Sequence, residues 1–127
     1  MVVEMIFIDS NILIAYFNEA DKNHYLSKEI LARIDKLTNE DVFISDYVFD
    51  ELVTVTLLKK KSKKTAIEAG KEILKSRIRI LKVNQKIFQK AWELFQNSEL
   101  KMSFTDFTNL AFLEILKIER IATFDKD

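Results

Sequence analysis

The chain has 127 residues and is 48% hydrophobic, which suits one globular domain with its own core. The absence of cysteine excludes disulfides, thiolate metal sites and cysteine catalysis, and a single glycine excludes the glycine-rich loops that cradle phosphates. Twenty basic and twenty acidic residues give a net charge of zero, which argues against nucleic-acid binding through overall charge and leaves a local basic patch open. No window approaches the ~18 apolar residues of a membrane span, and no basic leader precedes Glu4, so we expect a cytoplasmic protein with no membrane partner.

Hydrophobic periodicity predicts strands and helices that alternate along the chain. The expected strands cover residues 2–8, 42–44, 77–83 and 118–124. The expected helices cover residues 10–18, 24–37, 47–59, 65–76, 85–97 and 103–117. This alternation is typical of a three-layer α/β/α domain with a central parallel sheet of four strands, or of five if another edge strand follows. We expect one domain over residues 1–127.

The first strand ends in a group of polar residues. Four apolar residues, 5–8, come directly before Asp9, and a helical pattern follows at once. Because ligands of open α/β sheets bind outside the carboxyl ends of the strands, Asp9 is a candidate site residue. Asp9 is also a favourable helix N-cap, so a purely structural role is an equal alternative at this stage.

Three further acids stand at comparable places along the chain. Glu51 lies in the second turn of the helix after the second strand, beside the predicted buried stripe, although its neighbour Asp50 is a rival candidate. Asp106 lies in the first turn of the helix at 103–117, and Asp125 follows the last strand. Each of these acids also has a purely structural explanation. Glu51 could be an ordinary solvent-exposed acid on a helix, Asp106 could cap its helix, and Asp125 could be a turn residue.

A cluster of four carboxylates would need a counter-ion. Two like charges 4 Å apart repel by about 1 kcal/mol in water and about 4 kcal/mol at an effective dielectric constant of 20. Mg²⁺ prefers hard oxygen ligands, and such ions activate water and stabilise the oxyanions of phosphodiester hydrolysis. The acids therefore predict metal-assisted phosphoryl chemistry, provided that they converge.

Four segments of the chain resemble the PIN domain ribonucleases, and most of all the VapC-like toxins of toxin–antitoxin pairs. The matching segments are IFIDSNILIAYF at 6–17, ISDYVFDELVT at 44–54, MSFTDFTNLAF at 102–112 and IATFDKD at 121–127. They occur in the order that the family has and span nearly the whole chain. The resemblance implies a PIN-like fold and an endoribonuclease that depends on Mg²⁺ or Mn²⁺ and cleaves single-stranded regions of RNA.

The resemblance also implies roles for individual residues and for partners. It places Asp9, Glu51, Asp106 and Asp125 at the catalytic, metal-binding positions, with Asp9 and Asp106 as the favoured direct ligands. It gives supporting roles to Asn11, Thr105 and Thr123. It further implies a homodimer and a small antitoxin that blocks the pocket. The family usually continues beyond this point with a loop and an edge strand, so we expect either a smaller sheet here or a missing C-terminal segment.

Other interpretations remain open from the sequence. The chain could be a non-catalytic RNA- or protein-binding module with a vestigial acidic site. A phosphatase with Asp9 as nucleophile ranks last, because such enzymes carry a second aspartate where this chain has Asn11. The lysine run at 59–64 suits either a helix C-terminus or an RNA path, and the first is favoured. We expect His24 to start a helix, and Trp92 and most phenylalanines to lie in the core.

Overall fold

The computed structural model describes residues 4–37 and 40–125. It contains four strands and six helices within these ranges. In chain order they are β1 Glu4–Ile8, α1 Ser10–Tyr16, α2 His24–Asp35, β2 Glu40–Ser45, α3 Asp46–Lys60, α4 Lys63–Lys75, β3 Arg79–Leu81, α5 Gln85–Asn97, α6 Phe104–Leu116 and β4 Arg120–Ala122. All ten predicted elements are therefore present, although positions 2 and 3 of the first predicted strand lie outside the described residues.

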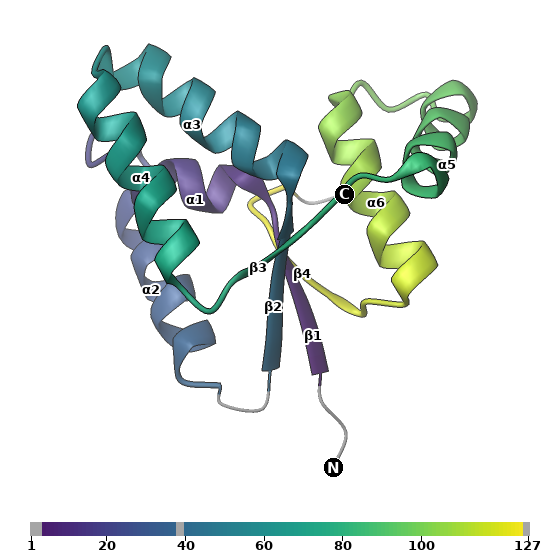
Figure 1. Ribbon diagram of the computed structural model, residues 1–127, viewed down its shortest axis with the longest axis horizontal. Coiled ribbons are helices and arrows are strands. Elements are labelled where there is room, and N and C mark those ends of the chain that lie inside the picture. The colour runs from purple at the N-terminus through teal and green to yellow at the C-terminus, as the bar shows by residue number, and fades with distance from the viewer. Residues whose placement is uncertain (1–3, 38–39, 126–127) are drawn as a thin grey trace.

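The four described strands form one parallel sheet in the order β3-β2-β1-β4. Helices α1 to α4 cover one face of the sheet, and α5 and α6 cover the other (Figure 1). This arrangement confirms the predicted three-layer α/β/α fold with a four-stranded parallel sheet. All strands point the same way, so their carboxyl ends share one edge of the sheet.

The core lies on both faces of the two central strands. Phe7 and Ile8 of β1 and Ile44 of β2 are fully buried, as a strand between two helical layers requires. Phe7 stacks on Phe112 of α6, with ring centroids 5.7 Å apart. Buried apolar contacts therefore fix α6 against β1, and α6 is the helix that carries Asp106.

Helices α3 and α5 begin directly after the polar residues that were predicted to cap them. Ser45 accepts a hydrogen bond from the Val48 N–H and starts α3, and Asn84 accepts one from the Ile87 N–H and starts α5. Helix α4 begins at Lys63 rather than at residue 65, because Ser62 caps it. His24 does start α2.

The prediction that the aromatic residues are mostly core is wrong for α5. The side chains of Phe88, Trp92 and Phe95 are 46%, 49% and 41% exposed. Helix α5 packs against α6, and only Ile87 and Ala91 of α5 are buried. Phe88 and Phe95 pack against Phe104 of α6 with ring centroids 5.3 Å and 6.2 Å apart, but α6 covers only one side of these rings and the other side stays at the surface.

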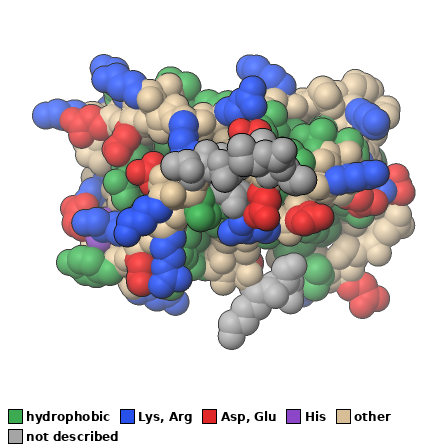
Figure 2. Space-filling model, turned by 90° about the horizontal axis from the view of Figure 1, so that it is seen from below, with side chains coloured by type: hydrophobic (Ala, Val, Ile, Leu, Met, Phe, Trp, Pro, Cys, Tyr) green, Lys and Arg blue, Asp and Glu red, His purple; other side chains and the backbone are tan. Residues whose placement is uncertain are grey.

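On the face beside the amino ends of the strands, acidic and basic side chains are intermixed (Figure 2). Within the described part of the chain, no helix combines the length and apolar character needed to cross a membrane.

Candidate active site

The first and last strands bring their polar ends together. Strands β1 and β4 are parallel neighbours, with Ile8 opposite Ala122. The Asp9 N–H donates a hydrogen bond of 2.9 Å to the Ala122 carbonyl, which extends the ladder by one step. Asp9 and Thr123 consequently leave the sheet side by side, although more than a hundred residues separate them in the sequence.

Three of the four predicted acids converge at this edge. One carboxylate oxygen from each of Asp9, Asp106 and Asp125 lies within 4.8 Å of the other two. They come from the end of β1, the first turn of α6 and the segment after β4. Among residues 4–37 and 40–125, none of these carboxylates forms an ion pair with a lysine or arginine.

Asp9 is the buried member of this acid cluster, at 4% exposure. Its Oδ1 atom accepts hydrogen bonds from the Ser10 N–H at 2.7 Å and from Asn109 Nδ2 at 3.1 Å. Its Oδ2 atom accepts one from Thr123 Oγ1 at 2.9 Å. These donors fix the carboxylate in one orientation, so Asp9 both caps α1 and presents a preset group to the cluster.

Asn11 and Thr123 connect α1 to the segment that carries Asp125. Asn11 Nδ2 donates to Thr123 Oγ1 at 3.3 Å, and Asn11 Oδ1 accepts from the Phe124 N–H at 3.3 Å. The Asp125 N–H donates to Thr123 Oγ1 at 3.0 Å. This network gives both residues a position suited to the predicted supporting role.

Glu51 reaches the cluster through Ser10. Ser10 Oγ donates a 2.5 Å hydrogen bond to Glu51 Oε1 and lies 3.5 Å from Asp9 Oδ1. Asp50, the rival candidate, is exposed and accepts a hydrogen bond from Thr54. The structure thus places Glu51, and not Asp50, at the edge of the cluster.

Asp106 is both a helix cap and a cluster member. Its N–H donates to Ser103 Oγ at 3.1 Å, and its Oδ2 accepts from the Ser103 N–H at 3.2 Å. This capping box fixes the carboxylate at the start of α6. The carbonyl of the neighbouring Thr105 accepts a hydrogen bond of 2.6 Å from Thr108 Oγ1, and among the described residues the Thr105 side chain forms no hydrogen bond to the acid cluster.

Burial and mutual repulsion raise the pKa values of two of the acids. Burial raises the pKa of Asp9 from 3.8 to about 6, and the charges of Asp106 and Asp125 add to the rise, while hydrogen bonds from Thr123 and Ser10 oppose it. Burial also raises the pKa of Glu51; the Ser10 hydroxyl opposes this rise, and the charges of Asp106 and Asp50 add to it. The site therefore holds negative charge at a cost that a cation would remove.

The residues present suit a hard divalent cation. Three carboxylate oxygens from separate segments face one another, and Mg²⁺ and Mn²⁺ favour such ligands. A further oxygen, Oδ1 of Asn109, is buried and has no hydrogen-bond partner within the described residues. Because buried polar atoms are normally satisfied, this oxygen fits a site completed by a cation or its water.

Two residues of the site were not predicted from the sequence. Ser10 stands next to Asp9 in the group of polar residues that ends the first strand, and its position in the sequence gives no sign of the hydrogen bond to Glu51. Asn109 follows Asp106 by three residues, so both lie on one face of α6, and this spacing in a mostly apolar helix was the available signal.

Comparisons with known proteins agree with this geometry. The PIN domain profile matches residues 6–127. VapC20 of Mycobacterium tuberculosis, a sarcin–ricin loop cleaving toxin, is 28% identical with a TM-score of 0.82, over 96% of this chain and 91% of that chain. VapBC2 of Rickettsia felis, bound to promoter DNA, is 20% identical with a TM-score of 0.61, over 95% of this chain and 99% of that chain. A toxin–antitoxin complex from Klebsiella pneumoniae is 23% identical with a TM-score of 0.63, over 96% of this chain and 88% of that chain.

The last two likenesses, below 25% identity, show the fold alone. No curated protein sequence gave a significant match. The profile, in contrast, covers all the segments that build the site. The chain therefore belongs to the PIN domain family of ribonucleases, and its fold is VapC-like.

Proposed function

We propose that the protein is a metal-dependent endoribonuclease that hydrolyses phosphodiester bonds in single-stranded regions of RNA. The convergence of Asp9, Asp106 and Asp125 from three distant segments carries this proposal. Membership of the PIN domain family supports the nuclease class. The similarity to a mycobacterial toxin that cleaves the sarcin–ricin loop supports RNA as the substrate.

Each acid has a proposed part in holding the cation. Asp9, Asp106 and Asp125 would bind it, and Glu51 would act directly or through water. When bound, Mg²⁺ or Mn²⁺ would lower the pKa of water and neutralise oxyanions at the phosphorus. Asp9 would need little reordering, because Ser10, Asn109 and Thr123 already hold its carboxylate.

The supporting residues would position the acids. Asn11 and Thr123 would keep the segment at 123–125 against α1, and thereby place Asp125. Ser10 would hold Glu51 at the edge of the site through its hydroxyl. Thr105 keeps its predicted supporting role on the strength of the resemblance alone.

We further propose that the protein is the toxin of a toxin–antitoxin pair and works in the cytoplasm, where RNA is present. The toxin–antitoxin complexes with the same fold support an antitoxin partner. A homodimer remains a prediction. Exposed apolar side chains on α4 and α5, among them Leu74 at 65% and Trp92 at 49%, are compatible with a protein contact of this kind.

Cleavage of labelled RNA by an Asp106→Asn variant tests the proposal. The asparagine oxygen can still accept the Ser103 N–H, so the helix cap and the fold should persist. Activity with Mg²⁺ or Mn²⁺ should fall by more than the roughly 10- to 100-fold that is typical when an outer partner of a metal ligand is lost. Asp50→Asn, which changes an exposed carboxylate on α3, is the matched control and should cleave like the wild type.

Two results would count against the nuclease proposal. One is equal cleavage by the wild type and Asp106→Asn with the cation present. The other is RNA binding without cleavage and without stabilisation by Mg²⁺ or Mn²⁺, which would support the non-catalytic module instead.

A further inference from the structure

A cluster of lysines surrounds the turn between α3 and α4. Five of the six residues from 59 to 64 are lysine, and the next acidic residue along the chain is Glu68. We call this group the lysine turn: Lys59, Lys60, Lys61, Lys63 and Lys64. All except Lys60 are exposed. In a chain with no net charge, this is a marked local excess of positive charge.

Helix electrostatics account for only two of the five lysines in this cluster. Lys59 and Lys60 lie in the last turn of α3, where cations interact favourably with the helix dipole. Lys63 and Lys64 instead lie in the first turn of α4, which contains no acidic residue. Cations are unfavourable at a helix N-terminus, so the fold gains nothing from these two lysines. Their presence calls for a role outside folding.

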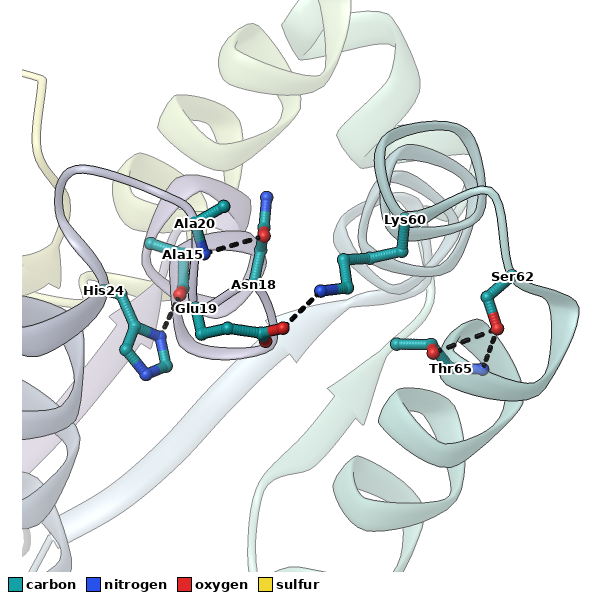
Figure 3. Close-up of polar contacts among 8 residues, drawn as sticks. All are labelled: Ala15, Asn18, Glu19, Ala20, His24, Lys60, Ser62 and Thr65. Atoms are coloured by element: carbon teal, nitrogen blue, oxygen red, sulfur yellow. Dashed lines mark hydrogen bonds and ion pairs between the residues drawn. The ribbon is translucent and has the colours of Figure 1, made fainter.

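Neighbouring acids leave most of the charge uncompensated. Glu19, in the connection between α1 and α2, accepts from Lys60 Nζ at 2.6 Å (Figure 3). The same view shows Ser62, which accepts from the Thr65 N–H at 3.1 Å and fixes the start of α4. Within the described ranges, the other lysines of the turn form no ion pair.

Helix α3 links the lysine turn to the acid cluster. It leaves the carboxyl end of β2 and runs to the turn before α4 (Figure 1). Glu51 and Lys60 are nine residues apart on this helix, a distance of about 14 Å along its axis at 1.5 Å per residue. A strand stacked as in duplex DNA, with about 3.4 Å of axis per phosphate, would cover that distance with about four nucleotides.

We propose that the lysine turn binds the sugar–phosphate backbone of the RNA substrate, about four nucleotides to one side of the bond that is cut. This inference rests on the proposed ribonuclease function and adds a subsite to it. Lysine contacts phosphate as a point charge and carries no base specificity, so the turn would position the strand for any sequence. Local placement of the charge also explains how a chain with no net charge can bind RNA.

A double variant, Lys63→Gln with Lys64→Gln, tests the subsite. It removes the cations that α4 does not need, so its thermal stability should equal or exceed that of the wild type. Binding of a fluorescein-labelled single-stranded RNA to the full chain, without divalent cation, is followed by anisotropy from 50 to 300 mM KCl. The slope of log K against log [KCl] should become less negative by about 1.4, since each phosphate contact of a single strand contributes about 0.7. Affinity at 100 mM KCl should fall by roughly tenfold or more.

The matched control carries the same change of charge elsewhere on α4. Lys71→Gln with Lys75→Gln alters exposed lysines in the second half of the helix and should leave the slope unchanged. If the first double variant proves unstable, Lys59→Gln with Lys61→Gln takes its place, with the same expected change in slope.

The outcomes separate this inference from the proposed function. A wild-type protein that cleaves RNA, together with equal salt slopes for both double variants, would overturn the subsite and leave the nuclease intact. A shift in oligomeric state on gel filtration with unchanged RNA binding would make the turn a protein contact, and would also overturn it. A wild type that neither binds nor cleaves RNA would overturn both.

Discussion

Replacing Asp9 with asparagine should stabilise the protein at neutral pH when no divalent cation is present. The rise in the pKa of Asp9 from 3.8 to about 6 corresponds to roughly 3 kcal/mol at 1.36 kcal/mol per pKa unit. Asparagine carries no charge, and its oxygen can still accept from Ser10 and Asn109. The hydrogen bond from Thr123 to Oδ2 would be lost, at about 1 kcal/mol, so the net gain is about 2 kcal/mol.

The effect should depend on pH in a defined direction. Because the pKa of Asp9 is higher in the folded state, the native protein binds more protons between pH 3.8 and 6. The favourable contribution of the protonated carboxyl is complete below pH 3.8 and is lost as the pH rises through 6. Urea unfolding, followed by circular dichroism in EDTA, should therefore show a larger advantage for Asp9→Asn at pH 7.5 than at pH 4.5.

A divalent cation should reverse the order of stability. Mg²⁺ at about 100 times its dissociation constant would stabilise the wild type by about 2.7 kcal/mol and should stabilise Asp9→Asn far less. Asp50→Asn, at an exposed position, should show neither effect. If Asp9→Asn is less stable than the wild type in EDTA at pH 7.5, by an amount that does not change with pH, the reasoning about a costly buried charge is wrong.

Two further changes test the site and the core. Asn109→Leu removes the Nδ2 donor to Asp9, so Mn²⁺ affinity measured by calorimetry should fall by about 10- to 100-fold. Asn109→Ser should bind Mn²⁺ with an affinity closer to that of the wild type. Unchanged Mn²⁺ affinity in the leucine variant would exclude a positioning role for Asn109. Phe7→Ala removes a fully buried ring stacked on Phe112 and should cost about 3–5 kcal/mol in urea unfolding, whereas a loss below about 1 kcal/mol would mean that the β1–α6 contact is not central to the core.

The sequence predicted the order of the elements because the strands between the two helical layers are short, apolar and bounded by polar residues. The run at 5–8 ends at Asp9, and its length suits a buried strand and is too short for a helix. The parallel sheet then brought Asp9 and Asp125 to one edge, as its topology requires. The order of the strands along the chain and their parallel direction were enough to predict that these two acids lie close together.

The rest of the site depends on the directions in which side chains point, and the spacing of apolar residues in the sequence does not predict these directions. The hydroxyl of Ser10 turns toward Glu51, and the amide of Asn109 turns toward Asp9. A polar residue in an apolar helix such as α6 could face either a neighbour or solvent, and only packing decides between them. The exposure of the aromatic side chains of α5 could not be predicted for the same reason. The spacing of apolar residues shows which side of a helix is apolar, but it does not show how much of that side a neighbouring element covers.

Capping and cation binding are compatible roles for Asp9 and Asp106. An ionised carboxylate has two oxygens and about four sites for accepting hydrogen bonds or binding a cation. Asp106 uses Oδ2 for the Ser103 N–H and still contributes an oxygen to the cluster. The helix cap fixes where that second interaction takes place, since it holds the side chain at the first turn of α6. From the sequence, helix capping was an alternative to a role in the site. In the fold, the helix cap is what orients the carboxylate toward the site.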